Sequence, residues 1–82
     1  MTLHGWHVAG LIVSVVTTGV AELGALLSAT PGFMVHAQDG ATGRLVVTLE
    51  TDSVEDQKAR FAWIRSLRGV QGVDLVYHEV SA

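Results

Sequence analysis

The order in which strand-like and helix-like segments follow one another constrains the fold of this chain most strongly. Four segments are rich in β-branched or alternating apolar residues and are bounded by turn residues, which predicts strands at residues 6–16, 33–38, 44–51 and 73–80. Two intervening segments carry apolar residues at helical spacing, one starting after Thr18 or Gly19 and one after Ser53. The predicted order is therefore β-α-β-β-α-β.

Both predicted helices have a recognisable start. Glu22 lies in the first turn of the earlier helix, where the helix dipole favours a carboxylate, and residues 30–32 (TPG) end that helix. Ser53 and Asp56 have the spacing of a capping box at the start of the later helix. The expected apolar stripes are Val20, Leu23 and Leu27 in the first helix and Val54, Phe61, Ile64 and Leu67 in the second.

This order of elements predicts a ferredoxin-like α+β sandwich, because right-handed crossovers and short connections leave few other arrangements. We expect a four-stranded antiparallel sheet of order 4-1-3-2 with both helices on one face. The 82 residues allow a single domain, residues 1–82, and no separate catalytic domain.

Composition excludes several classes of function. The chain has no cysteine, which excludes a disulfide scaffold, a thiol nucleophile and metal sites built on thiolates. Its formal charge of -3 argues against a nucleic-acid partner. The apolar run at residues 8–16 is about nine residues long, against roughly 20 needed to span a bilayer, and no Lys or Arg precedes it as in a signal peptide. We expect a cytoplasmic protein that begins near Met1 and does not insert into membranes.

Strand parity divides the residues of the sheet between two faces. One face should pack on the helices; its expected residues are Ala9, Leu11, Val13, Val15, Val35, Leu45, Val47, Leu49, Val73, Leu75 and Tyr77. The other face should stay uncovered; its expected residues are Trp6, Val8, Gly10, Ile12, Ser14, Met34, His36, Gln38, Arg44, Val46, Thr48, Glu50, Asp74, Val76 and His78. The apolar members of the second set predict a surface for a partner chain or for self-association.

No metal or catalytic site emerges from the residues. His36 and His78 are expected on one face but on opposite edge strands, roughly 14 Å apart, which is too far for one ion to bridge. His4 and His7 lie near the terminus and add no clear ligand set. No serine has the context of a nucleophile elbow, and the acidic residues 52–56 are explained by the helix dipole. We expect no enzyme activity, no cofactor and no metal.

Four stretches of the sequence, in order, resemble the NapD family. They are the opening strand at residues 6–13 (WHVAGLIV), the helix end from Leu26 to Pro31-Gly32, the hairpin at residues 39–46, and the closing strand at residues 72–78. The resemblance implies a cytoplasmic chaperone of ferredoxin-like fold that binds the twin-arginine signal peptide of the periplasmic nitrate reductase catalytic subunit. It further implies that the peptide binds as a helix against the open sheet face. Export is then delayed until the molybdenum cofactor and an iron–sulfur cluster are inserted, and the chaperone needs neither itself.

The resemblance and the uncovered face together predict where a signal peptide would bind. Apolar side chains can accept the apolar core of a helical peptide, and Glu50 and Asp74 can attract its arginines. The sequence also allows a weak homodimer that forms through the same face. The expected signal-peptide-binding residues are Trp6, Val8, Ile12, Val46, Thr48, Glu50, Asp74, Val76 and His78.

Two alternative functions are also compatible with the predicted fold. A small-molecule-binding or dimerisation regulatory domain of the same fold would form a stable dimer and show no affinity for the peptide. An acylphosphatase-type enzyme is suggested by residues 69–73 (GVQGV), but Leu75 stands where that family carries a phosphate-cradling arginine. We rank the acylphosphatase reading last.

Overall fold

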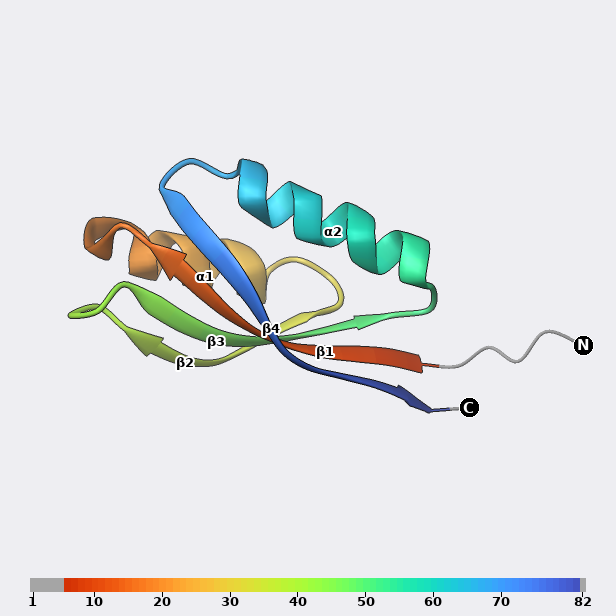
Figure 1. Ribbon diagram of the computed structural model, residues 1–82. Coiled ribbons are helices and arrows are strands. Elements are labelled where there is room, and N and C mark those ends of the chain that lie inside the picture. The colour runs from red at the N-terminus through yellow and green to blue at the C-terminus, as the bar shows by residue number, and fades with distance from the viewer. Residues whose placement is uncertain (1–5, 82) are drawn as a thin grey trace, which may run out of the picture.

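The computed structural model describes residues 6–81 as a two-layer α/β sandwich (Figure 1). The four strands pair antiparallel in the order β2-β3-β1-β4, which confirms the predicted order, and both helices lie on one side of the sheet. No helix in this part of the chain is long and apolar enough to cross a membrane. The elements are β1 (Trp6–Val15), the 3₁₀ turn η1 (Thr17–Gly19), α1 (Val20–Ser28), β2 (Phe33–Asp39), β3 (Arg44–Thr51), α2 (Val54–Ser66) and β4 (Val70–Ser81).

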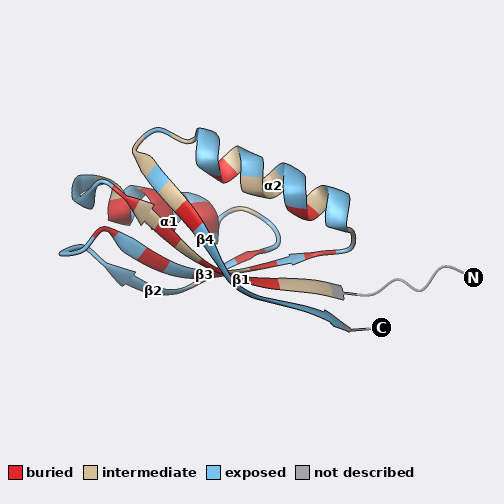
Figure 2. Ribbon diagram, viewed as in Figure 1, coloured by how far each residue is buried: buried red, intermediate tan, exposed pale blue. Residues whose placement is uncertain are grey.

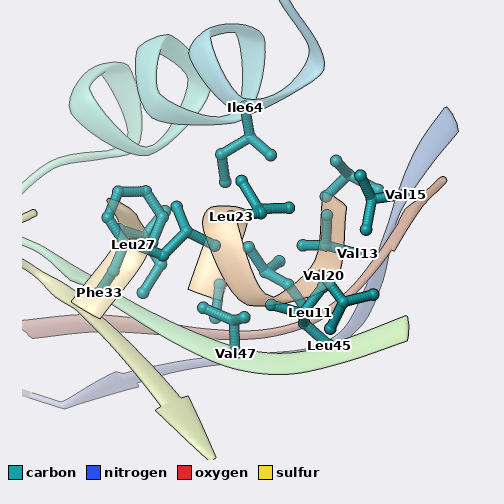
Figure 3. Packing of buried hydrophobic residues seen from close by; sticks show 13 residues of the cluster. Leu11, Val13, Val15, Val20, Leu23, Leu27, Phe33, Leu45, Val47 and Ile64 are labelled. Atoms are coloured by element: carbon teal, nitrogen blue, oxygen red, sulfur yellow. The ribbon is translucent and has the colours of Figure 1, made fainter. Parts of the chain in front are cut away.

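A single apolar core fills the space between the helices and the sheet (Figures 2 and 3). The alternating residues of β1 and β3 supply its floor, as parity predicted, and α1 supplies its predicted stripe from above. Leu11, Leu45 and Leu49 have no exposed surface, and neither do Leu27 of α1 and Ile64 of α2. Burial of these side chains drives the packing of both helices onto the sheet.

The start of α2 agrees with the predicted cap, but its apolar stripe does not agree throughout. Ser53 Oγ accepts a hydrogen bond from the backbone N–H of Asp56 at 3.0 Å. Ile64 is buried and Phe61 and Leu67 are partly buried, whereas Val54 stays 40% exposed because it is the first residue of the helix, at the edge of the packed layer. Gln57 is buried in α2 although the sequence pattern did not single it out.

Strand pairing is irregular at three points, one of them between Ser14 and Val15 near the start of β4. The other two determine which side chains share the uncovered face. In the β1–β4 pair, Gly10 lies opposite Tyr77 but Leu11 lies opposite Leu75, so one extra residue, Val76, is accommodated in β4. In the β2–β3 pair, the same happens at His36, between Val35 and Ala37. Such a bulge shifts the alternation of the strand by one residue beyond it.

Candidate functional site

The sheet face opposite the helices is uncovered by any element within residues 6–81 (Figure 1). Its centre is β1, whose Val8, Gly10 and Ile12 alternate with the buried residues Ala9 and Leu11. Each of these three residues has one direct neighbour on β3 and one on β4. We call this surface the open face; its central rows are Glu50–Val8–Glu79, Thr48–Gly10–Tyr77 and Val46–Ile12–Asp74.

A shallow hollow of about 360 Å³ lies in the middle of the open face. Gly10 leaves its floor without a side chain, while Val46, 45% exposed, and Val76, 59% exposed, present methyl groups to solvent. Exposed apolar side chains that gather around a hollow are typical of a surface that binds another chain. The side chains that line it come from Ile12, His36, Val46, Thr48, Val76 and Tyr77.

The bulge in β4 overturns the predicted placement of two residues. We expected Tyr77 to face the helices, but it lies opposite Gly10 on the open face and its ring contacts that glycine. We expected His78 on the open face, but it pairs with Ala9 and turns toward the helix side of the sheet. The cause is the extra residue, because a shift of one position exchanges the two faces of a strand. His36 and His78 therefore do not share one face of the sheet, contrary to our expectation.

The same bulge brings to the open face a residue that sequence reasoning missed. Glu79 lies opposite Val8, so Val8 is flanked by a carboxylate on each side, Glu50 from β3 and Glu79 from β4. No local sequence signal marks the bulge, and parity alone assigns Glu79 to the helix side. Asp74, next to Ile12, adds a third carboxylate, whereas Arg44 lies opposite Ser14 beyond the last of the three rows.

The bulge in β2 corrects one further assignment. We expected Gln38 on the open face, but it lies opposite Leu45 and its side chain contacts Gly24 of α1, while Ala37 takes the open-face position beside Val46. His36 remains on the open face as predicted. Its Nε2 is 2.8 Å from Thr48 Oγ1, which holds the imidazole at the edge of the hollow.

Most of the predicted binding residues thus share one surface. Val8, Ile12, Val46, Thr48, Glu50, Asp74 and Val76 lie on the open face, and His78 does not. Trp6 pairs with Ser81 in the sheet, but its side chain lies outside the described part of the structure. In the described residues no three His, Asp or Glu side chains gather as a metal site.

The glycine-rich stretch before β4 has a structural role. Gly69 has a φ of 86°, a conformation that suits glycine, and the backbone oxygen of Gly69 accepts a hydrogen bond from Val16 N–H at 3.0 Å. This turn leads directly into β4 at Val70 rather than at the expected Val73. Of the stretch that suggested an acylphosphatase, Gly69 therefore ends the turn after α2, and residues 70–73 form the start of β4.

Comparisons with known proteins agree with this architecture. The family model described as NapD protein matches residues 6–82. The proteins named Chaperone NapD from Escherichia coli (strain K12) and Shigella flexneri are each 31% identical over 74 residues, which cover 90% of this chain and 85% of theirs. The solution structure of the E. coli Tat proofreading chaperone protein NapD superposes with a TM-score of 0.83 at 31% identity, covering 94% of this chain and 82% of that one. These relatives are chaperones and not enzymes, and this chain belongs to the NapD family.

Proposed function

We propose that this protein binds the twin-arginine signal peptide of the periplasmic nitrate reductase catalytic subunit on its open face. Binding occurs in the cytoplasm and delays export of the precursor until its cofactors have been inserted. The observation that carries the proposal is an uncovered sheet face with an apolar hollow at its centre, in a protein of a family that includes a Tat proofreading chaperone.

The centre of the open face suits the apolar core of such a peptide. A helical segment presents apolar side chains at spacings of three and four residues. These side chains need an apolar surface from whose centre no side chain protrudes. Gly10 supplies a floor with no side chain, and Ile12, Val46 and Val76 surround it with methyl groups. Burial of Val46 and Val76 by the peptide would gain about 25 cal/mol for each Å² of apolar surface removed from water.

One end of the open face suits the basic start of the peptide. Arginine guanidinium groups bind carboxylates through paired, charge-assisted hydrogen bonds. Glu50 and Glu79 offer two carboxylates on either side of Val8, one row from the hollow. We therefore place the two arginines beside Val8 and the apolar core over Gly10 and Ile12.

Calorimetric titration with the signal peptide of the nitrate reductase precursor tests the proposal. We expect 1:1 binding to the native protein and strong loss of binding in the double variant Val46→Ser, Val76→Ser, which should stay folded because both side chains are already exposed. The matched control is Leu26→Ser, an apolar residue of α1 that is 43% exposed on the other side of the sheet and should leave binding unchanged. Full binding by the folded double variant would exclude the open face as the binding surface.

The same exposed apolar face also fits a second copy of the chain, as in dimeric regulatory domains of this fold. Sedimentation of the native protein and of the double variant separates the two functions. A stable dimer that the double variant abolishes, together with no affinity for the peptide, would favour the regulatory domain over the chaperone.

A further inference from the structure

Two imidazole rings lie against each other on the helix side of the sheet. His7 belongs to β1 and is partly buried, and His78 belongs to β4 and is exposed. Their rings are stacked with centroids 5.3 Å apart and an angle of 23° between their planes. His7 Nδ1 is 3.1 Å from His78 Nε2, so one hydrogen bond joins the two rings.

We propose that His7 and His78 form a binding site for a late first-row divalent metal ion such as Zn²⁺, which His7 Nδ1 and His78 Nε2 would ligate together. Histidine nitrogens bind zinc at about 2.0–2.1 Å, so two of them at angles between 90° and tetrahedral lie about 2.8–3.4 Å apart. The observed 3.1 Å falls inside this range. Neutral imidazole is the side chain that such ions prefer when no thiolate is present.

The backbone holds the two ligands on one face of neighbouring strands. His78 pairs with Ala9 and His7 pairs with Val80, so the histidines are diagonal neighbours across the antiparallel β1–β4 pair. This placement depends on the bulge in β4, since without the extra residue His78 would point to the open face. The bulge therefore provides the second ligand as well as moving Tyr77.

With only two histidine ligands, we expect a metal site that keeps coordination positions for water, and not a structural site with four protein ligands. Structural zinc sites have four protein ligands, whereas a site with fewer protein ligands keeps positions for water. Within residues 6–81 no third His, Asp or Glu side chain completes a ligand group there. Metal binding requires that neither ligating nitrogen carries a hydrogen. Each neutral imidazole then has its ring hydrogen on the other nitrogen, His7 Nε2 and His78 Nδ1.

Metal at this site would cross-link β1 to the last part of β4. That part of β4 carries Tyr77 and Glu79, which point to the opposite face and belong to the open face. The metal would thus stabilise the strand that forms one side of the hollow. The metal site itself does not depend on the proposed peptide binding.

Titration of the full chain with Zn²⁺ tests this inference. A competing chromophoric chelator measures the affinity, and imidazole NMR signals identify the ligands. We expect saturable 1:1 binding that shifts the signals of His7 and His78 and raises the unfolding temperature, since a ligand of the folded state stabilises it. Binding should be lost in both His7→Gln and His78→Gln, each checked for native-like amide dispersion without metal.

The matched control is His36→Gln, which removes an imidazole from the opposite face and should leave zinc binding unchanged. Absence of saturable binding to the folded native protein would overturn the inference. So would native affinity in the folded His7→Gln and His78→Gln proteins, or loss of binding only in His36→Gln.

Discussion

The ring of Tyr77 lies over Gly10, in the space that a side chain at position 10 would occupy. A Cβ built on Gly10 would collide with three ring atoms of Tyr77, the third of them, Cζ, at 2.8 Å. The glycine therefore allows the ring to lie close to the sheet as one side of the hollow. The bulge in β4 is what brings Tyr77 to this position.

Replacement of Gly10 by alanine should displace the Tyr77 ring. We expect the Gly10→Ala protein to lose about 1–3 kcal/mol of stability in urea unfolding, the usual cost of overpacking, and to bind the signal peptide more weakly. The control is Gly40→Ala, where the added Cβ meets no atom within 4 Å. Equal stability of the Gly10→Ala and Gly40→Ala proteins would contradict the contact.

A double-mutant cycle isolates the collision from the intrinsic effect of alanine in a strand. In the Tyr77→Ala background, Gly10→Ala should be neutral or slightly stabilising, because glycine inside a strand is otherwise unfavourable. A penalty that persists without the tyrosine ring would assign the cost to something other than Tyr77.

The sequence predicted the fold and most of the open face because alternation is regular in β1 and β3. Val8, Ile12 and Val46 follow directly from that parity. The errors at Tyr77, His78 and Gln38 all lie beyond a bulge, where one extra residue exchanges the faces. Neither bulge has a local sequence marker, since β-branched and polar residues continue through both. The register of β2 and β4 beyond the bulges is therefore determined by tertiary packing, which the alternation of residues in the sequence does not reveal.

The corrected apolar face of α2 predicts unequal effects of two truncations. Ile64→Ala removes a fully buried side chain and should cost about 2–4 kcal/mol in chemical unfolding. Val54→Ala removes methyl groups from a residue that is 40% exposed and should change stability by no more than about 0.5 kcal/mol. If the two variants were equally destabilised, the predicted stripe that included Val54 would be right after all.

Arg60 joins α2 to the loop between α1 and β2. Its Nη1 donates a hydrogen bond to the backbone oxygen of Pro31 at 2.6 Å, and its guanidinium lies 5.7 Å from the centre of the Phe33 ring. We expect Arg60→Met to cost about 1 kcal/mol in thermal unfolding, since the hydrogen bond is exposed. Lys58→Met, an exposed change on the same helix, serves as control; matching losses would show that the Pro31 contact contributes nothing.

The hairpin between β2 and β3 should respond to acid at an unusually low pH. The pKa of Asp39 is lowered from its ordinary 3.8, first by the hydrogen bond from the Ala41 N–H and then by hydrogen bonds from Thr42. A carboxyl with a lowered pKa stabilises the fold above its ordinary pKa, and this contribution is lost as the pH falls through the lower value. The amide signal of Ala41 should therefore titrate with a midpoint below 3.8. A midpoint at or above that value would mean that these hydrogen bonds do not persist in solution.

Glu79 should take part in binding the arginines of the signal peptide, although parity alone places it on the other face. It lies beside Val8, across from Glu50. Because an ion pair at an exposed site contributes about 0.5–1 kcal/mol, Glu79→Gln should weaken binding about two- to fivefold, and less at high salt. Glu55→Gln changes the net charge equally but lies in α2, so it should leave the affinity unchanged. With both peptide arginines replaced by glutamine, Glu79→Gln should have no further effect. An equal loss in the Glu79 and Glu55 variants would show that overall charge, and not the position beside Val8, attracts the peptide.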